Sequence, residues 1–261
     1  MSVKISVVIT TYNRNNFLKY AIQSLINQSF QDWEAIIVDN NIVNDAYEIV
    51  CDFKDKRLRY LTLKQNLGEC GGRNYAIQNS IGSFICYLDD DDLLPQNSLS
   101  SRYEFIKSCA DSGMIFGEFL RFREEKEIGS PSFQDTFNLP LSLRKNRFDG
   151  LLAKDNFNRK NALFYLKQFN FIRAGTPLIR KYIFNKVGMF DKNLTLFGDY
   201  DMWLRITAST KINFLNEVVY FYRHHSESVS TLARNDDLRN NARLLLNKHP
   251  TMSNPLIKVL L

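Results

Sequence analysis

The feature that most constrains the fold of this chain is an alternation of short apolar runs with helix-like segments over residues 1–95. The apolar runs are nearly continuous and rich in β-branched residues, which is typical of strands buried on both faces. Strands are predicted over residues 3–10, 33–40, 58–63 and 83–88, and helices over residues 13–30, 45–53 and 71–81. Strands that alternate with helices in this way predict βαβ units and a parallel sheet.

Polar side chains follow each of the predicted strands at the point where the strand ends. They are Thr10, Thr11 and Tyr12 after the first strand, Asp39 and Asn40 after the second, Asn66 after the third, and residues 89–92 after the fourth. In open α/β sheets, ligands bind in the crevice beyond the carboxyl ends of the strands. The sequence therefore predicts one binding crevice, to which all four strand ends deliver polar groups.

The run of four aspartates at residues 89–92 needs a positive partner, because like charges at this spacing repel one another. A calcium loop of the EF-hand type is excluded. Counted from Asp89, its sixth and twelfth positions are Leu94 and Ser100 rather than glycine and glutamate. A divalent cation shared with a phosphate ligand fits better, because Mg²⁺ and Mn²⁺ combine one or two carboxylates with substrate phosphates.

The four acids are not expected to be equivalent. If the extended geometry of the strand continues, Asp89 and Asp91 point into the crevice and Asp90 points elsewhere. Asp92 is assigned to the cap of the helix that follows, since capping requires only one acid.

The composition is that of a folded protein with a sizeable core, because 44% of the 261 residues are hydrophobic and 24% are charged. The apolar run at residues 5–9 is too short for a signal-peptide core or a membrane span. No run reaches about 18 apolar residues, so we expect a cytoplasmic protein. The four cysteines form no C-x-x-C pair and are expected to be reduced thiols.

The formal net charge of +6 is concentrated in residues 143–173, where eight lysines and arginines outnumber two aspartates. The same segment carries several aromatic residues. One interpretation is the solvated face of an amphipathic helix. The alternative is contact with an anionic partner, either lipid phosphate, a membrane surface or nucleic acid, although no recognisable nucleic-acid reader motif is present. We therefore expect no nucleic acid partner.

Six stretches of the sequence resemble, in the same order, the motifs of family 2 glycosyltransferases of the GT-A fold. They are VVITTYNR (7–14), IIVDN (36–40), NLGECGGRN (66–74), YLDDDD (87–92), VGMFDKNLTLFGDYDMWLRI (187–206) and YRHHSESVS (222–230). The resemblance implies an α/β fold with a Rossmann-like, mostly parallel central sheet flanked by helices. It also implies a second, smaller acceptor-side sheet and a C-terminal helical segment.

The same resemblance implies a division of the chain. We expect a GT-A domain over residues 1–232, with the nucleotide-sugar half at 1–109 and the acceptor half at 110–232. A helical tail is expected over residues 233–261.

Roles for the donor-binding residues also follow from the resemblance. Thr11 and Tyr12 are expected to line the base pocket, Asp39 to hydrogen-bond the base, Asn66 and Arg73 to lie near base or diphosphate, and Asp89 and Asp90 to contact ribose and sugar. Asp91, the second acid of the D-x-D element, is expected to bind a divalent metal, Mn²⁺ or Mg²⁺. His225 matches the histidine of a Y-R-x-H pattern and is placed near the metal or diphosphate, with Arg223 or a purely structural role as alternatives.

Asp199 matches the acid that the family uses as catalytic base, and Asp201 is the alternative. Family 2 enzymes invert the anomeric centre, so one carboxylate is needed to accept the proton of the acceptor hydroxyl. The sequence departs from the family pattern at two positions. These departures affect which nucleotide or sugar is expected, and not the expected class of enzyme. Asn40 stands where a second acid is usual, and Gly198 stands where glutamate generally precedes the base.

These observations predict a metal-dependent inverting glycosyltransferase that uses a nucleotide-diphosphate sugar, with a UDP-sugar preferred. The acceptor is expected to be a glycan or a lipid-linked saccharide for a surface polysaccharide. Residues 143–173 are then a candidate contact with an anionic membrane at its inner face. The alternatives are a degenerate module that binds without chemistry and a nucleotidyltransferase. The second is disfavoured because TTYNRNN (10–16) has no glycine to hold a triphosphate.

Overall fold

A computed structural model of the chain describes residues 3–41, 43, 46–122, 159–226 and 233–260. The elements in chain order are β1 (Ile5–Thr11), α1 (Asn15–Ile26), β2 (Trp33–Asp39), α2 (Tyr47–Asp52), β3 (Leu58–Thr62), α3 (Gly68–Asn79), β4 (Phe84–Tyr87), α4 (Ser98–Ser108), β5 (Ser112–Phe122), α7 (Arg159–Leu166), β6 (Leu178–Arg180), α8 (Ile183–Val187), α9 (Gly198–Ser209), β7 (Lys211–Arg223), α11 (Asn235–Lys248) and α12 (Pro255–Val259).

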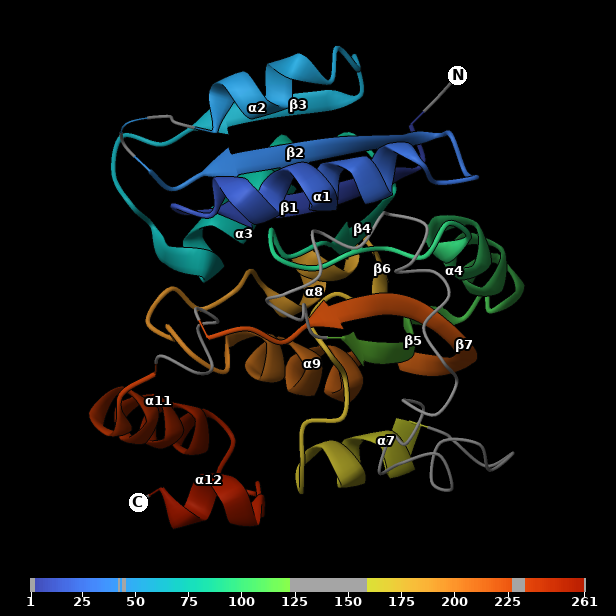
Figure 1. Ribbon diagram of the computed structural model, residues 1–261. Helices are drawn as coiled ribbons and strands as arrows, with labels where there is room; N and C mark the ends of the chain where they lie inside the picture. The colour runs from blue at the N-terminus through green and yellow to red at the C-terminus, as the bar shows by residue number, and fades with distance from the viewer. Residues whose placement is uncertain (1–2, 42, 44–45, 123–158, 227–232, 261) are drawn as a thin grey trace.

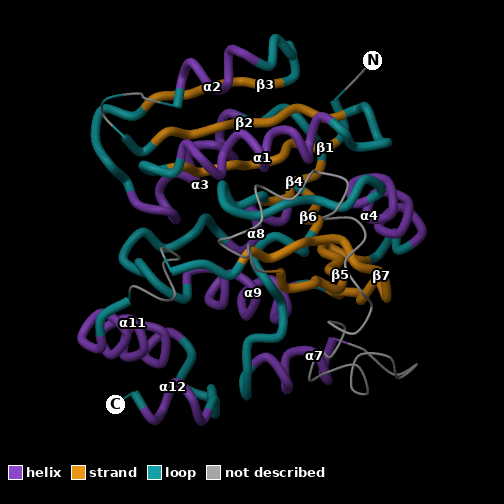
Figure 2. Tube along the Cα trace, in the orientation of Figure 1, coloured by secondary structure: helices purple, strands orange, loops and turns teal. Residues whose placement is uncertain are grey.

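The seven strands of the described residues form one sheet in the order β3-β2-β1-β4-β6-β5-β7 (Figures 1 and 2). β1 is parallel to β2 and β4, β2 is parallel to β3, and β5 is parallel to β7. Only the short strand β6 runs antiparallel to its neighbours β4 and β5. The predicted fold class, a mostly parallel sheet flanked by helices, is therefore confirmed. In the described residues, β5 and β7 do not form a separate acceptor-side sheet, because β6 joins them to the central one.

Alternate side chains of the central strands enter the cores on opposite faces of the sheet. On β1, Val7 and Ile9 pack with buried residues of α1 and α4, whereas Val8 packs with residues of α3 and α9. Figure 1 shows α1 in front of β1. Because helices cover both faces, β1 is buried at nearly every position, and its run of apolar residues at 7–9 is the pattern that predicted it from sequence.

The C-terminal helices α11 and α12 pack on the domain rather than away from it. Ala242 and Leu245 of α11 are fully buried in the core that contains α9. The backbone N–H of Ser253 donates to the carbonyl of Lys167, just after α7, at 2.8 Å. The expected C-terminal helical segment is confirmed, while the expected domain boundaries stay predictions.

Three further expectations concern the basic segment, a membrane span and the cysteines. Residues 143–158 of the basic segment lie outside the described residues, whereas α7 begins within the remainder of that segment. Across the described parts of the chain, no helix has the length and apolar character needed to cross a membrane. All four cysteines are described, and each is a free thiol.

Candidate active site

The carboxyl ends of β1 and β2 lie side by side and bring the first predicted donor residues together. Thr11 and Asp39 are paired in the parallel register, and the backbone N–H of Asn40 donates to the carbonyl of Thr11 at 2.9 Å. Thr11 is buried, whereas the side chain of Tyr12 is 51% exposed. The side chain of Tyr12 is thus accessible to a ligand, whereas Thr11 is buried at the end of β1.

Asp39 is fully buried and both of its carboxylate oxygens accept hydrogen bonds. Its Oδ1 accepts from the backbone N–H of Asn41 at 2.8 Å, and its Oδ2 accepts from the hydroxyl of Tyr60 at 2.6 Å. These bonds hold the carboxylate in place, and both of them come from groups of the protein itself. The expected hydrogen bond from Asp39 to a nucleotide base stays a prediction.

The start of α3 is fastened to the ends of these two strands. Asn40 Oδ1 accepts from the backbone N–H of Leu67 at 3.2 Å. A Cβ on Gly72 would lie 2.9 Å from Thr10 Cγ2 and 3.0 Å from Asn40 Nδ2, so glycine permits this close approach of helix and sheet. Asn40, which departs from the usual acid, therefore holds the helix that carries Arg73. Asn66 is exposed, and its Oδ1 accepts from the N–H of Gly68 at 2.7 Å.

Arg73 is a buried cation in the centre of the site. Its Nη2 lies 2.5 Å from Glu69 Oε1 and 2.8 Å from Asp89 Oδ1. Its guanidinium also lies 5.2 Å from the ring centroid of Tyr87 and 5.7 Å from that of Phe190. Burial opposes the charge, but the two carboxylates raise the pKa of Arg73 above its ordinary value. Arg73 therefore stays charged and fixes Asp89 at the end of β4.

The four aspartates form a turn rather than an extension of β4. The strand ends at Tyr87, and the backbone N–H of Asp92 donates to the carbonyl of Asp89 at 3.1 Å. The alternation of side chains ends with the strand, so the extended geometry under which Asp90 was expected to point elsewhere is not present. Nη1 of Arg14 bridges the two acids, at 3.1 Å from Asp90 Oδ1 and 2.7 Å from Asp91 Oδ2.

Asp92 does not cap the following helix, so that prediction was wrong. α4 begins at Ser98, six residues further along the chain, with Asn97 in the N-cap position. Instead, Oδ1 of Asp92 accepts from the backbone N–H of Arg223 at 2.7 Å and ties the turn to the end of β7. Burial, together with the charges of Asp91 and Asp89, raises the pKa of Asp92 well above its ordinary value.

Two residues at the end of β7 complete the surroundings of Asp91. His225 Nε2 lies 3.0 Å from Asp91 Oδ2, and the imidazole packs on the ring of Phe17 with centroids 4.7 Å apart. Arg223 Nε donates to the backbone carbonyl of Asp91 at 2.6 Å. Of the two alternatives, His225 therefore contacts the side chain of Asp91, whereas Arg223 supports its backbone.

The residues around Asp91 fit a divalent ion that is also held by a phosphate. Asp91 offers a hard oxygen and His225 a nitrogen, and Nδ1 of His225 is buried without a hydrogen-bond partner among the described residues. In that part of the chain no group of three or more acidic, histidine or cysteine side chains could hold a metal alone. Mg²⁺ and Mn²⁺ typically take one or two protein carboxylates and complete their coordination with phosphate and water.

Asp199 lies in the first turn of α9, near Arg73. Its Oδ1 accepts from the backbone N–H of Tyr200 at 2.7 Å, and Nδ2 of Asn170 lies 3.4 Å from its Oδ2. Burial raises the pKa of Asp199, and the charge of Arg73 opposes that rise. A carboxylate with a raised pKa is a better proton acceptor than an ordinary aspartate.

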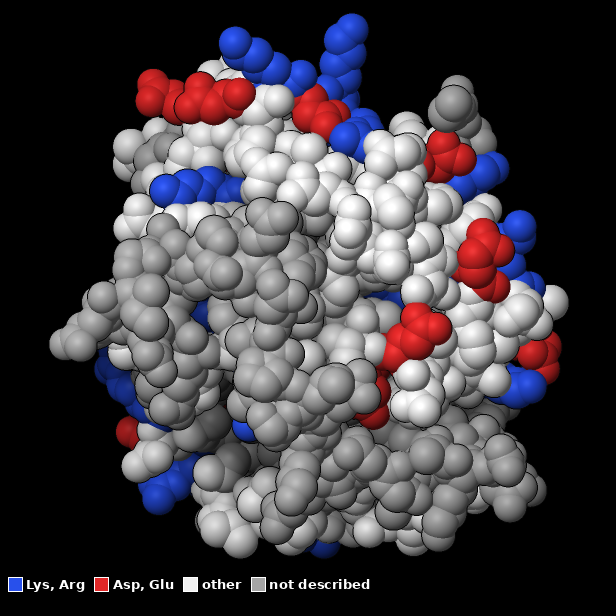
Figure 3. Space-filling view, turned by 45° about the vertical axis from the view of Figure 1, so that its right-hand side comes forward, with Lys and Arg blue, Asp and Glu red and all other residues white. Residues whose placement is uncertain are grey.

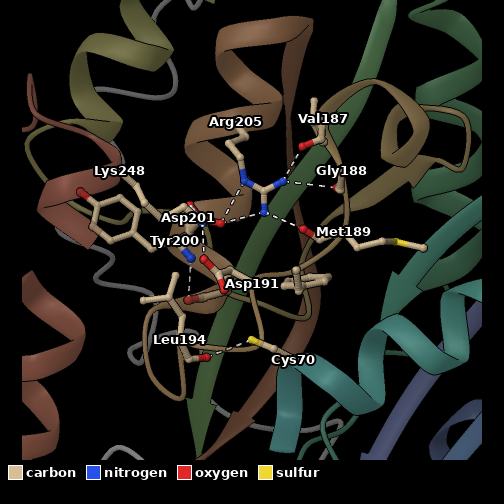
Figure 4. A network of polar contacts seen from close by, with 12 residues as sticks. Cys70, Val187, Gly188, Met189, Asp191, Leu194, Tyr200, Asp201, Arg205 and Lys248 are labelled. Carbon is tan, nitrogen blue, oxygen red and sulfur yellow. Dashed lines mark hydrogen bonds and ion pairs between the residues drawn. The ribbon is translucent and has the colours of Figure 1, made fainter. Parts of the chain in front are cut away.

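Asp201 is engaged in structural contacts instead (Figure 4). It is fully buried, and its carboxylate contacts Arg205 Nη2 at 2.7 Å, Lys248 Nζ at 3.0 Å and His249 Nε2 at 2.9 Å. Although burial opposes ionisation, hydrogen bonds from His249 and Arg205 hold the pKa of Asp201 well below its ordinary value. Arg205 also donates to the carbonyls of Val187 and Met189 and so fixes the loop before α9.

Several residues of this site were not predicted from the sequence. Arg14 and Glu69 lie inside stretches that carry the family resemblance, so their position was a signal, but neither had an assigned role. Asn170 beside Asp199 and Tyr220, whose hydroxyl accepts from the N–H of Asp89 at 3.1 Å, come from segments without a recognisable motif.

Comparisons with known proteins identify the family of the chain. The sequence profile of glycosyl transferase family 2 matches residues 6–185. Glycosyltransferase GlyG of Streptococcus pneumoniae is 26% identical over 237 residues, which cover 88% of this chain and 73% of that protein. GalNAc(5)-diNAcBac-PP-undecaprenol beta-1,3-glucosyltransferase of Campylobacter jejuni is 35% identical over 125 residues, or 46% of this chain and 40% of that protein.

Two solved structures share the fold. TarS 1-349 of S. aureus has a TM-score of 0.68 and 19% identity, over 94% of this chain and 65% of that one. The same fragment was also solved in complex with UDP-GlcNAc. The mannosyltransferase PcManGT from Pyrobaculum calidifontis, in complex with GDP-Man and Mn²⁺, has a TM-score of 0.62 and 12% identity, over 100% of this chain and 68% of that one. The chain thus spans about two thirds of the length of these structures.

Proposed function

The chain belongs to glycosyl transferase family 2, and from that premise we propose that it transfers a sugar from a nucleotide-diphosphate donor to a hydroxyl group, with inversion at the anomeric carbon. A UDP-sugar is the preferred donor, because the structural neighbour TarS was solved in complex with UDP-GlcNAc. The family assignment accounts for the expected enzyme class, a glycosyltransferase.

The observation that carries the proposal is the separation of two acids with different surroundings. Asp91 lies in a turn among Arg14, Arg223 and His225, in which a cation and a diphosphate can be held. Asp199 comes from α9, where burial raises its pKa and the positive charge of Arg73 opposes that rise. Pairs of acids whose environments set them apart are typical of acid–base assignments in active sites.

The geometry supports the following division of work. A metal ion bound through Asp91 and His225 would supply positive charge to the departing diphosphate. Arg73 adds a fixed positive charge beside Asp89, near the expected ribose and sugar. Asp199 accepts the proton of the acceptor hydroxyl as that oxygen attacks the anomeric carbon. Because the attack is direct, no second carboxylate is needed as a nucleophile.

The acceptor is proposed to be a glycan or a lipid-linked saccharide. One relative, from Campylobacter jejuni, is named for a saccharide carried on PP-undecaprenol. A lipid-linked acceptor brings the enzyme to a membrane surface, and residues 143–173 remain the proposed contact with anionic lipid at the inner face. On the described part of the face drawn in Figure 3, Lys and Arg are interspersed with Asp and Glu. Sedimentation with liposomes tests this contact, and equal binding to neutral and anionic vesicles contradicts it.

The donor is tested by incubating the protein with Mn²⁺ and each of a panel of nucleotide sugars. Slow hydrolysis of one donor to free nucleoside diphosphate is expected, and a UDP-sugar should be that donor. Saturable binding of one donor without turnover favours a degenerate binding module over an enzyme. Neither binding nor turnover with any donor contradicts the proposed function.

A further inference from the structure

The side chain of Arg14 contacts the acidic turn at residues 89–92. The proposed reaction assigns no role to this arginine. It lies between β1 and α1, and its Nη1 contacts Asp91 Oδ2 at 2.7 Å and Asp90 Oδ1 at 3.1 Å. The contacts join parts of the chain that are 76 and 77 residues apart. The arginine is in the N-cap position of α1.

The oxygen that Arg14 contacts belongs to the carboxylate proposed as the metal ligand. Asp91 Oδ2 already has Arg14 Nη1 at 2.7 Å and His225 Nε2 at 3.0 Å. A divalent ion on this oxygen would sit about 2.1 Å away. The guanidinium of Arg14 and a divalent cation repel each other strongly when both contact one carboxylate oxygen. Metal binding to Asp91 Oδ2 therefore requires the guanidinium of Arg14 to move away.

The turn does not depend on Arg14 for its backbone. Arg223 Nε donates to the carbonyl of Asp91, and the N–H of Arg223 donates to Asp92 Oδ1. The N–H of Asp89 is held by the hydroxyl of Tyr220. Arg14 contacts the carboxylates of Asp90 and Asp91, and its side chain is 19% exposed. Other groups hold the backbone of the turn, so the turn can stay in place when this guanidinium changes partners.

We propose that Arg14 is a tethered counter-ion that holds Asp90 and Asp91 in the donor-free enzyme and transfers to the diphosphate when metal and nucleotide bind together. The inference rests on the proposed function, since it requires a diphosphate and a divalent ion at this turn. A guanidinium binds phosphate oxygens through paired hydrogen bonds, so the diphosphate offers it an equivalent partner. Arg14 is thereby a positioning residue that makes metal binding depend on the nucleotide.

This exchange predicts a thermodynamic coupling between the two ligands. A nucleoside diphosphate that takes Arg14 away from Asp91 raises the affinity of Asp91 for the metal, and by linkage the metal raises the affinity for the nucleotide. Without nucleotide, Arg14 competes with the metal. Removal of Arg14 should therefore strengthen the binding of metal alone, which is the opposite of what loss of a structural support would do.

The test measures Mn²⁺ binding by the electron paramagnetic resonance signal of the free ion, with and without UDP. In the wild type, UDP is expected to tighten Mn²⁺ binding about tenfold or more. Arg14→Gln should bind Mn²⁺ alone about tenfold more tightly than the wild type, with a correspondingly smaller effect of UDP. Arg14→Lys keeps the positive charge but has a shorter side chain and lacks the planar guanidinium that pairs with phosphate, so it should be intermediate.

Arg57→Gln is the matched control. It also removes one positive charge from an aspartate, because Arg57 Nη2 pairs with Asp55 Oδ2 at 2.6 Å in the turn before β3. It should leave Mn²⁺ binding unchanged, which separates the local effect from a change in net charge. A tightening as large as that of Arg14→Gln would overturn the proposal.

The other possible results of the Mn²⁺-binding experiment also test the proposal. Unchanged or weaker binding of Mn²⁺ alone by folded Arg14→Gln overturns the proposal, and if that variant does not fold, the same result with Arg14→Lys does so. If the wild type binds Mn²⁺ and UDP but the coupling survives in both variants, only the role of Arg14 is wrong. If the wild type binds neither ligand, the proposed donor site is wrong and the role of Arg14 fails with it.

Discussion

A Cβ atom on residue 198 would overlap the Sγ of Cys70, so Gly198 and Cys70 form the contact that brings the start of α9 against the start of α3. Cys70 Sγ also donates to the carbonyl of Leu194, in the loop that leads to α9. This contact sets the position of Asp199, the next residue, relative to Arg73 on α3. It also gives a physical reason for glycine where the family generally has glutamate, because no side chain fits here while Cys70 is present.

Gly198→Ala should therefore destabilise the protein by about 1–3 kcal/mol, because an added methyl group forces the two helices apart. Combining it with Cys70→Ala, which removes the sulfur, should recover much of that loss. Urea unfolding of the two single variants and the double variant measures the coupling. Strictly additive free energies would show that the two residues do not share a packing contact.

Asp199→Asn should retain donor binding and lose transfer by about 10²- to 10⁴-fold, because asparagine keeps the shape but cannot accept the proton. The measurement is donor affinity together with the rate of transfer to an acceptor. Asp111→Asn removes an exposed acid paired only with Lys211 in the described residues, and serves as the control with unchanged rates. Normal transfer by Asp199→Asn would refute its assignment as the base.

The pH dependence of transfer should reflect the raised pKa of Asp199. Burial shifts that pKa upward, so the carboxylate becomes protonated at a higher pH than an ordinary aspartate. Since only the ionised form accepts a proton, the rate should fall as the pH falls through this raised pKa, which lies above the usual value of about 3.9. A rate profile that stays flat down to about pH 4 would contradict this expectation.

The sheet and the location of the crevice could be predicted because they depend on local pattern. β1 and β2 are buried on both faces, and a strand of that kind is apolar at almost every position. The polar residues Thr11 and Asp39 then mark where those strands end, and parallel pairing brings the ends together. Neither step requires knowledge of contacts between distant residues.

The geometry of the aspartate turn could not be predicted in the same way. The alternation rule requires an extended backbone, and four identical residues give no indication that β4 ends at Tyr87. The partners that shape the turn are Arg14 and Arg223, which lie 77 and 132 residues away from Asp91. Asp199 and Asp201 posed the same difficulty, because their different environments come from Arg73 on α3 and from Lys248 and His249 at the C-terminal end of α11.

Asp91→Asn should weaken the metal-dependent part of donor binding, because the neutral amide loses the charge that attracts the ion. The same part should be lost in the wild type when EDTA removes the metal. Isothermal titration of UDP with and without Mn²⁺ measures both effects, and Asp111→Asn is again the control for the loss of one acid. Equal dependence on Mn²⁺ in Asp91→Asn and the wild type would move the metal site elsewhere.

Asp201→Asn should lower the free energy of unfolding by about 3–5 kcal/mol at neutral pH, because Arg205 and Lys248 lose a buried counter-charge and the contact with His249 is altered. The folded-state pKa of Asp201 is depressed, so its stabilising effect is complete above the unfolded value of about 3.9 and is lost as the pH falls toward the lower folded value. The difference between variant and wild type should thus shrink below about pH 4.

Asp191→Asn provides the matched comparison for that prediction. Asp191 also contacts Lys248 Nζ, at 2.8 Å, but its side chain is 26% exposed. A solvent-exposed pair contributes little, so its loss should cost about 1 kcal/mol or less. Urea unfolding at pH 7 and at a series of lower pH values measures both variants. If Asp201→Asn costs no more than Asp191→Asn, the buried carboxylate is not the anchor of the loop before α9, and its alternative role as the catalytic base regains weight.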